Sequence, residues 1–555
     1  MANKTFSAIL AFLLLAALIA VSLSDHQNHM AEAAREAERE EAAAFGTYDA
    51  ENTVVLWYAD DALTEFLTTN ALSYQAETGI HVETVLVSGV DYLEQINTAS
   101  VYNGEEASDG TPYRAPDLFV TTHDTLMRAY LAGLACTIQD PHGVVVEENF
   151  PQTSLHAASC DDKLIAYPLS YETNFFLYNK TYMQDIARTK VEAESDRIEG
   201  EAAQAAADAE GAEGENADEE KNKKKEDEQG ADDGKKKDEA SEGDEDAGGE
   251  GEGDMPEEEG DDLDPMGEED VEKSPEVLKK LATMIPQTID DIKNFANNYD
   301  APENVEAVFK WDVSDIFYNY FFVGNYMNVG GENGDNNGMF NIYNRQSVEC
   351  LQVYQDMNNF FSIDAKEVNY DKILQEFLDG KTVFTVATTD AVAKIEEAAL
   401  EGDFNYEYGI SVLPDVSSTL KARGLSVTTV IAVNGYGEKK AQANDLASYL
   451  SFEKGPELYR KAGKISCRRG CVYDNNEIYN IMNEYEKSVP LPKMIETTNF
   501  WVQLEIAMSK VWNGADPDET LHELSDTIGA QIEEIDYHIP VQESIEIGGA
   551  GVFVP

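Results

Sequence analysis

Basic residues are scarce in this chain, and this scarcity limits what the protein can bind. The 555 residues contain 40 Lys and Arg against 107 Asp and Glu, which gives a formal net charge of −67. A charge this negative repels phosphate backbones and excludes nucleic-acid binding through a basic face. Histidine and cysteine are also rare, and they form neither a CxxC pair nor a cluster with ligand spacing. The sequence therefore predicts no metal site and no cofactor.

The five cysteines leave the disulfide question open. Cys136 and Cys160 flank one short segment, Cys467 and Cys471 lie close together, and Cys350 is left over. Outside the cytosol either of the first two pairs could persist as a disulfide. Isolated thiols are the alternative.

Long apolar runs are missing except at the N-terminus. Lys4 precedes an apolar stretch at residues 6–21, which ends in the small-residue step Ser22-Leu23-Ser24. This pattern predicts a secretory signal over residues 1–24, although about 16 apolar residues would also just suffice for an uncleaved anchor. We therefore expect an extracytoplasmic protein, either tethered to the cell surface through residues 25–47 or released into the periplasm or medium.

Aromatic residues are absent from 191–270, a segment with 35 acidic and 8 basic residues. Such a composition cannot bury enough apolar surface to fold. We therefore expect a disordered acidic insert over 186–275, with room for a partial helix near 190–209. Two roles remain open for this insert. It could be a charged segment that aids solubility and spacing, or a weak reservoir for Ca²⁺ or other cations.

Before the insert, the sequence alternates strand and helix patterns. β-branched and aromatic runs at 53–58, 81–87 and 117–121 predict buried strands, and helical apolar spacing follows the first of them. The alternation predicts an α/β fold with doubly wound, mainly parallel sheets. Ligands of such sheets bind beyond the carboxyl ends of the strands, so the loops at 58–61 and 122–124 are candidate ligand loops.

Residues 162–180 carry a resemblance to a known family. They read Asp-Lys-Leu-Ile-Ala-Tyr-Pro-Leu-Ser-Tyr-Glu and end in Leu-Tyr-Asn-Lys, which is similar to the hinge segment of the maltose-binding protein-like receptors of ABC sugar importers. Further segments resemble the family in the same order along most of the chain outside the insert. They are Ala115–Val120 with His123-Asp124, Pro286–Asp291, Phe377–Phe384 and Asn499-Phe500-Trp501.

The resemblance implies a two-lobed periplasmic-binding-protein fold of type II, in which crossing strands join two α/β lobes that close over a ligand. It also implies a monomeric receptor, not an enzyme, that captures a sugar or oligosaccharide and delivers it to the permease subunits of an ABC transporter. The expected boundaries are 48–170 with 425–463 for the N-terminal lobe, 171–424 with 464–540 for the C-terminal lobe, and 541–555 for a tail.

The chemistry of sugars selects the candidate binding residues. Carboxylates accept hydrogen bonds from paired hydroxyl groups, and aromatic rings cover the apolar faces of sugars. We therefore select carboxylates after strands or at the expected hinge, nearby aromatic residues and one loop threonine; Trp501 is included because the resemblance places an aromatic residue under the sugar. The set is Tyr58, Asp60, Asp61, Thr122, Asp124, Tyr171, Glu172, Trp311, Asp312, Asp390 and Trp501. Trp57, which alternates with Tyr58, is expected to face the core.

Two departures from the family bear on the ligand. The family's Gly-Pro-Trp is Thr388-Thr389-Asp390 here, and Thr121-Thr122 stands before His123 in place of an aromatic residue. The cleft is therefore expected to be more acidic and less aromatic than a maltodextrin site. This favours short, branched, amino or otherwise polar sugars.

Two other functions remain as alternatives. A polyamine or peptide receptor of the same fold would suit an acidic cleft. A secreted glycosidase would need a carboxylate pair, which Asp60, Asp61, Glu172 and Asp390 could supply in principle. No nucleophile, metal-protease or P-loop motif supports catalysis.

Residues 333–338, Asn-Gly-Asp-Asn-Asn-Gly, resemble the start of a calcium loop. The closing Glu is missing, because Asn344 stands in its place. We therefore expect an Asx- and Gly-rich turn.

Overall fold

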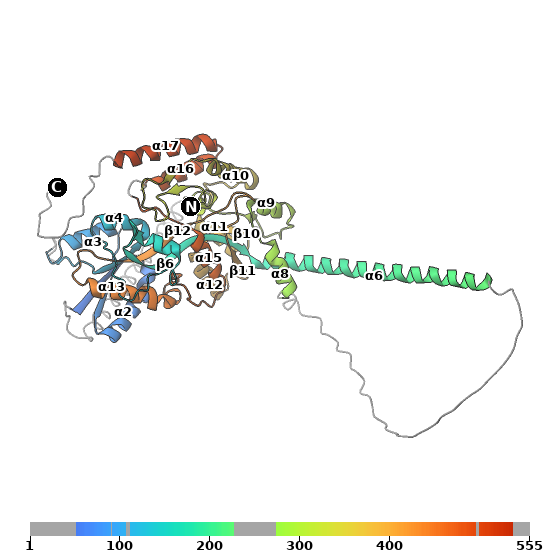
Figure 1. Ribbon diagram of the computed structural model, residues 1–555, viewed down its shortest axis with the longest axis horizontal. Coiled ribbons are helices and arrows are strands. Elements are labelled where there is room, and N and C mark those ends of the chain that lie inside the picture. Colours follow the sequence, from blue (N-terminus) through green and yellow to red (C-terminus); the bar gives the residue numbers. More distant parts are fainter. Residues whose placement is uncertain (1–51, 90, 107–111, 227–273, 495–498, 537–555) are drawn as a thin grey trace, which may run out of the picture.

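The computed structural model describes residues 52–89, 91–106, 112–226, 274–494 and 499–536. The expected signal segment, tether and C-terminal tail lie outside these residues. Two α/β lobes sit side by side, with the strands of the hinge passing between them (Figure 1). No helix of the described part is long and apolar enough to cross a membrane.

One composite sheet runs through both lobes in the order β2-β1-β3-β12-β6-β10-β7. In the N-terminal lobe, β2 and β3 are parallel to β1, and β12 is antiparallel to β3. In the C-terminal lobe, β10 is parallel to β7. These strands are β1 (Thr53–Tyr58), β2 (His81–Leu86), β3 (Leu118–Thr122), β7 (Ala307–Phe309), β10 (Thr382–Thr388) and β12 (Leu425–Val433).

The hinge is built on the long strand β6 (Ala166–Asn179). Its first part, up to Thr173, pairs with β12. From Asn174 onward it pairs with β10 and β11 (Tyr408–Ser411) in the other lobe. The short strand β13 (Val489–Pro490) pairs with β12 as a further connection. The expected α/β fold with two lobes and crossing strands is therefore confirmed.

Helices cover both faces of the sheet in each lobe. In the N-terminal lobe, α2 (Thr64–Thr78), α13 (Lys440–Ser448) and α14 (Leu458–Ala462) pack on one face, and α3 (Tyr92–Val101) and α4 (Leu126–Leu131) on the other. In the C-terminal lobe, one core contains α9 (Ile289–Asn298), α10 (Arg345–Phe361), α16 (Phe500–Trp512) and α17 (Pro517–Asp536). The other contains α11 (Tyr370–Leu378), α12 (Asp390–Glu401) and α15 (Ile478–Lys487).

Two small hairpins and one helix lie near the hinge. They are α5 (Gln152–Ala157), the pair β4 (Ser159–Cys160) and β5 (Lys163–Leu164), and the pair β8 (Asn328–Val329) and β9 (Phe340–Asn341). Residues 333–338 form the turn of the second hairpin, as expected. All five cysteines are free thiols.

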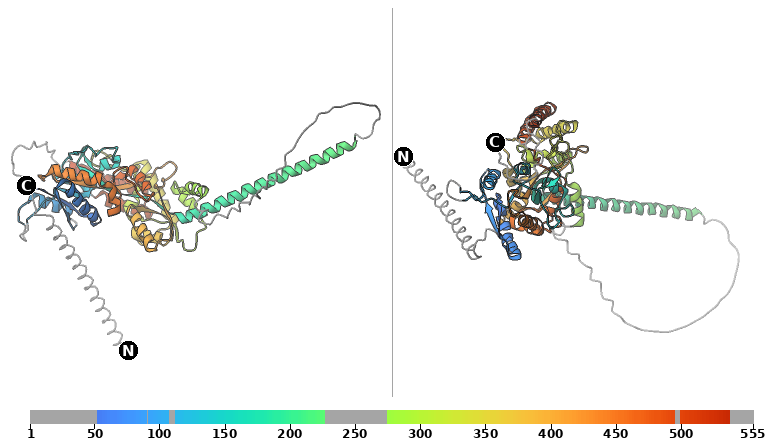
Figure 2. Two further views of the ribbon diagram at one scale, coloured as in Figure 1. Left: turned by 90° about the horizontal axis from the view of Figure 1, so that it is seen from below. Right: turned by 60° about the vertical axis from the view of Figure 1, so that its left-hand side comes forward.

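The acidic insert begins as a helix. The chain leaves β6 directly into α6 (Lys180–Glu226), which extends away from the C-terminal lobe (Figures 1 and 2). Helix α8 (Pro275–Met284) packs beside its first turns, where Lys280 Nζ lies 2.9 Å from Glu194 Oε2. The partial helix expected near 190–209 is therefore part of a longer helix, and the expectation of disorder is wrong for the rest of 186–226. Ala, Glu and Lys are strong helix formers, and α8 supplies a packing partner; residues 227–273 lie outside the described part.

Removing the outer part of this insert should leave the folded body unchanged. We expect a chain in which a short Gly/Ser linker replaces residues 205–270 to unfold within about 0.5 kcal/mol of the wild type, because this acidic segment contains no aromatic residue that could contribute to a core. A matched deletion from residue 187 removes buried Ala187 and the Glu194 ion pair, and it should destabilise the protein. Urea unfolding of both chains tests this; a large loss in the first deletion would show that 205–270 contribute packing.

Glu484 on α15 should make stability depend on pH. Its side chain is 4% exposed, and burial raises its pKa from 4.5 to about 7, although the N–H of Leu413 donates to Oε2 at 3.2 Å and lowers it. The folded state thus binds this proton more tightly than the unfolded chain. Proton binding at Glu484 therefore stabilises the folded protein by about 3 kcal/mol below pH 4.5, and this stabilisation is lost as pH rises towards 7.

The variant Glu484→Gln should lack this dependence. The difference in unfolding free energy between wild type and variant, measured by urea unfolding on both sides of the window, should therefore change with pH in favour of the wild type at acid pH. A difference that is constant with pH would contradict the assignment.

Candidate functional site

A charged cluster lies where the N-terminal lobe meets the hinge. Lys464 Nζ lies 3.1 Å from Asp60 Oδ2 and 3.1 Å from Glu172 Oε1. Asp60 follows β1 and caps the 3-10 helix η2 (Asp61–Leu63) by accepting the N–H of Ala62 at 3.1 Å. Glu172 is on β6, and Lys464 follows α14. We call Asp60, Glu172 and Lys464 the hinge cluster.

The electrostatics of the hinge cluster keep Lys464 charged. Burial lowers its pKa, but Glu172 and Asp60 raise it by more, so the pKa lies above its usual value. The side chain of Glu172 remains 47% exposed. Each carboxylate offers about four acceptor positions, so both can accept hydrogen bonds from a ligand while Lys464 is bound.

Strand register places Thr122 on the same face as Glu172. Thr122 pairs with Thr429, and Glu172 pairs with Val427, two residues earlier on β12. Because side chains two residues apart share a face, Thr122 and Glu172 point to one side of the sheet. Asp124 follows Thr122 in the next turn and is partly exposed.

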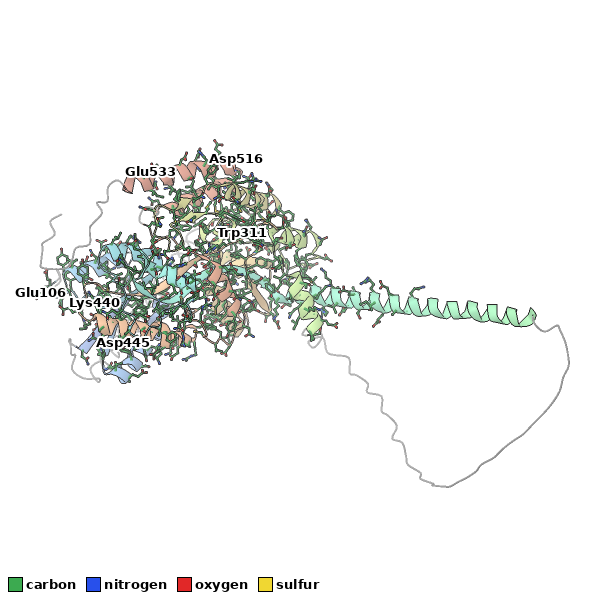
Figure 3. All side chains as sticks on the ribbon, in the orientation of Figure 1. Glu106, Trp311, Lys440, Asp445, Asp516 and Glu533 are labelled. Carbon is green, nitrogen blue, oxygen red and sulfur yellow. The ribbon has the colours of Figure 1, made fainter. Side chains whose placement is uncertain are left out.

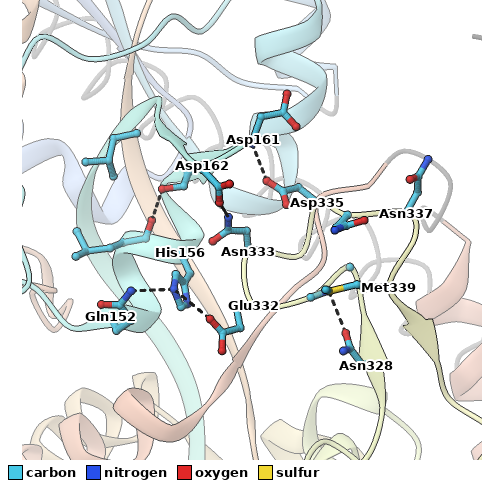
Figure 4. Close-up of a pocket in the computed structure, with 16 residues that line it drawn as sticks. Gln152, His156, Asp161, Asp162, Asn328, Glu332, Asn333, Asp335, Asn337 and Met339 are labelled. Carbon is cyan, nitrogen blue, oxygen red and sulfur yellow. Dashed lines mark hydrogen bonds and ion pairs between the residues drawn. The ribbon is translucent and has the colours of Figure 1, made fainter. Parts of the chain in front are cut away.

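A cavity of about 930 Å³ lies between α5 and the two small hairpins (Figure 4). Carboxylate and amide side chains line it. The N–H of Asp161 donates to Asp335 Oδ2 at 2.9 Å, and Asn333 Nδ2 donates to Asp162 Oδ1 at 3.1 Å. These contacts join the two small hairpins. No group of metal-ligating side chains with suitable geometry occurs among the described residues, here or elsewhere.

A smaller cavity, of about 540 Å³, opens at the end of the N-terminal strands. Tyr92, Thr121, Thr125 and Arg128 contribute to its lining. The hydroxyl groups of Thr121 and Thr125 are 2.8 Å apart. The hydroxyl of Tyr92 is buried, and no described atom is its hydrogen-bond partner. A buried polar group without a partner costs free energy, so a polar ligand atom at Tyr92 would be stabilised.

The sequence did not identify Lys464, Tyr92 or Arg128 as candidates. The signal for Tyr92 was available: it follows the second predicted strand, and β2 is parallel to β1 and β3, so their carboxyl ends meet at one edge. Lys464 carried no local signal, because its partner Glu172 is 292 residues away.

The C-terminal lobe holds Asp390 in a hydrogen-bonded group. Asn174, two residues beyond Glu172 on β6, donates to the carbonyl of Phe317 at 2.7 Å. The adjacent Tyr318 stacks on Tyr370 at 4.8 Å, and the hydroxyl of Tyr370 donates to Asp390 Oδ1 at 2.8 Å. Burial tends to raise the pKa of Asp390, but hydrogen bonds, first from the Lys394 ammonium at 2.8 Å, lower it below its usual value.

Four predicted site residues lie in the packed interior instead of a cleft wall. Tyr58 is 2% exposed, and Tyr171 stacks on Tyr485 at 3.8 Å. Trp311 is fully buried inside the C-terminal lobe (Figure 3), where its Nε1 donates to Asn319 at 2.9 Å. Asp312 is 5% exposed and accepts the backbone N–H and hydroxyl of Ser314.

For Tyr58 and Tyr171, which lie on strands, the physical reason is that helices cover both faces of the sheet; Trp311 and Asp312 instead follow β7. Alternate side chains of such a strand point to two faces that are both buried. Alternation along the strand therefore does not distinguish core residues from cleft residues. Trp57, expected in the core, is therefore more exposed than Tyr58.

Among the described residues, the side chains of Asp61 and Trp501 form no hydrogen bond or ion pair with the hinge cluster. Asp61 is exposed at the start of η2. Trp501 is partly buried on α16, with ring centres of Tyr320 and Phe500 at 5.2 and 5.1 Å. One turn further, Glu505 accepts the N–H of Ile316 at 3.3 Å. Trp501 therefore borders the segment that carries Tyr318.

His123 orders its loop. It is fully buried; Nδ1 accepts the N–H of Thr428 at 3.0 Å, and Nε2 donates to the carbonyl of Leu491 at 2.9 Å. Burial, with a contribution from Lys493, lowers its pKa to about 4. The neutral ring fixes the end of β3 against β12.

Two lobes, crossing strands and a polar cluster at their junction define a two-lobed α/β architecture. The chain resembles the extracellular solute-binding protein of Staphylococcus aureus in complex with maltose, with a TM-score of 0.60, 17% identity, and 88% of this chain and 100% of that chain covered.

It also resembles a cyclo/maltodextrin-binding protein complexed with maltotetraose (TM-score 0.59, 15% identity, 88% and 99% covered). A third similar structure is the maltose-binding periplasmic protein of Listeria monocytogenes in complex with maltose, with a TM-score of 0.57, 14% identity, and 87% of this chain and 99% of that chain covered. No protein-family model and no curated protein matches the chain. The chain thus has the fold of extracellular solute-binding proteins.

Proposed function

We propose that this protein is an extracytoplasmic carbohydrate receptor. It captures a sugar or oligosaccharide between its lobes and delivers it to the permease subunits of an ABC transporter. The observation that carries the proposal is the hinge cluster, because it places two carboxylates and an ammonium at the junction of lobes whose fold is that of maltose- and maltodextrin-binding proteins.

The proposed site contains both hydrogen-bond acceptors and a hydrogen-bond donor, and a sugar needs both. Asp60 and Glu172 accept hydrogen bonds from neighbouring hydroxyl groups, and Lys464 donates to a ring or hydroxyl oxygen. Thr122 and Asp124 extend the polar wall on the N-terminal lobe. Trp501, which is partly buried, supplies aromatic surface on the C-terminal lobe. Closure brings the two walls onto one ligand.

Lys464 distinguishes this proposal from a polyamine receptor. An ammonium at the centre of the cluster repels a cationic ligand and satisfies the carboxylates that such a ligand would need. Catalysis by paired carboxylates is also not proposed. Asp390 is held by Lys394, Thr388 and Tyr370, which lower its pKa, whereas a general acid requires a raised one.

A thermal-shift panel tests the ligand class. Maltotriose, amino sugars and other short oligosaccharides should raise the melting temperature of the full chain, because a ligand bound only by the native state stabilises it by about 2.7 kcal/mol at a hundredfold excess over Kd. Spermidine and a mixed tripeptide are the matched non-sugar ligands. A shift with spermidine or peptide and none with any sugar would overturn the proposal.

A further inference from the structure

A groove of about 1090 Å³ lies outside the hinge cluster. Residues from α12, β11, α14 and the loop at 472–477 line it. It belongs to the side of the C-terminal lobe where Tyr171 is buried, whereas Glu172 points to the opposite face of β6. The groove shares no residue with the hinge cluster.

A fixed polar group forms part of this groove. Tyr459 donates its hydroxyl to Glu396 Oε2 at 2.9 Å, and Asn475 Nδ2 donates to Glu396 Oε1 at 2.8 Å. The same amide lies 2.6 Å from the hydroxyl of Tyr408. The hydroxyl of Tyr459 is thus held at the Glu396 carboxylate, and the hydroxyl of Tyr408 is held at the Asn475 amide. The two rings come from different elements. We call Glu396, Tyr408, Tyr459 and Asn475 the tyrosine groove.

The tyrosine groove keeps surface for a ligand. Tyr408 and Tyr459 are only partly buried, and Glu396 retains acceptor positions beyond its two hydrogen bonds. Two side chains at its edge, Leu400 and Val472, are 90% and 83% exposed, more than any other large hydrophobic side chain in the described part. Both line the groove, so apolar surface is exposed at a concave site.

We propose that the tyrosine groove is a second carbohydrate-binding site, separate from the hinge cluster. A sugar ring has an apolar C–H face and an edge of hydroxyl groups. Two tyrosine rings match the face, and the carboxylate and amide between them match the edge. Because the hydrogen bonds already fix both rings, little side-chain freedom is lost on binding. The open shape suits one end of a longer saccharide.

Calorimetric titration of the full chain with maltotriose tests the inference. The wild type should bind two equivalents, the weaker one with a Kd of the order of 1 mM, typical of an open site with few contacts. Tyr459→Ala should weaken that equivalent more than tenfold and leave the tighter one unchanged. Val472→Glu adds a charge at an exposed position and should weaken it without disturbing the fold. Tyr436→Ala, at a half-exposed tyrosine of the other lobe, is the control.

The outcomes separate this inference from the proposed function. Titrations in which neither Tyr459→Ala nor Val472→Glu weakens any equivalent would overturn the second site and leave the receptor proposal standing. Loss of only the tighter equivalent in Glu172→Gln supports the receptor site. A Tyr459-dependent signal given by a Leu-Leu-Lys peptide, and not by maltotriose, would make the groove a peptide-docking surface and refute the inference.

Discussion

Replacing Glu172 with glutamine should weaken sugar binding by about tenfold or more. The substitution keeps the shape of the side chain but removes its charge, and hydrogen bonds to a charged acceptor contribute about 1.5–3 kcal/mol each. At about 1.4 kcal/mol per decade, the loss of one such bond reaches a factor of ten. The protein should stay folded, because the side chain is 47% exposed and lines no core.

A stricter test uses Lys464, because its ammonium group binds both Asp60 and Glu172. Lys464→Met alone should also weaken binding, and the double variant should lose less than the sum of the two single effects, because both residues belong to one hydrogen-bonded group. Titration calorimetry with the best sugar of the panel measures all three. Glu401→Gln, an exposed carboxylate at the end of α12, is the control. Wild-type affinity in Glu172→Gln would refute the site and leave the fold unaffected.

Trp501 is a less direct probe than Glu172. Its ring is partly buried against Tyr320 and Phe500. Truncation to alanine therefore removes core packing as well as any sugar-stacking surface. An affinity loss in Trp501→Ala needs a parallel measurement of unfolding before it can be assigned to the ligand.

The hinge was predictable from sequence because its pattern is local. The run from Ala166 to Glu172 lies on one strand, and its resemblance to a family identified both the crossing and Glu172. The start of α6 was less predictable. Its composition argues against a folded core, and the stabilising contact comes from Lys280, beyond the acidic segment.

The binding wall was harder to predict for two physical reasons. First, Tyr58, Tyr171 and Trp311 were selected because they lie near expected ligand loops or the hinge, and such positions do not show whether a side chain packs in the interior, as these three do. Second, the cation that organises the cluster comes from a distant segment. Lys464 meets Asp60 and Glu172 only because α14 packs on the N-terminal lobe, which no local pattern reports.

Replacing Lys493 with methionine should destabilise the protein by about 3 kcal/mol or more. The residue is 1% exposed, and its Nζ donates to the carbonyl groups of His156 at 2.7 Å, Ala157 at 3.1 Å and Ser159. Its backbone N–H donates to Gly334 at 2.6 Å, so it links the end of α5 to the turn of the other lobe. Methionine fills a similar volume but leaves three carbonyl groups without this donor, each at about 1 kcal/mol or more.

The pH dependence of this loss distinguishes the ammonium from simple packing. Burial lowers the pKa of Lys493 to about 8, from 10.5. Between these values the unfolded chain binds the proton more tightly than the folded protein, so this group adds stability as pH rises through the window. The difference in unfolding free energy between the wild type and Lys493→Met, measured by urea unfolding, should therefore increase above pH 8 by up to about 3 kcal/mol. Lys510→Met, at an exposed lysine of α16, should show neither effect. A gap below about 1 kcal/mol that does not change with pH would mean that water replaces the ammonium and that Lys493 does not hold the lobes together.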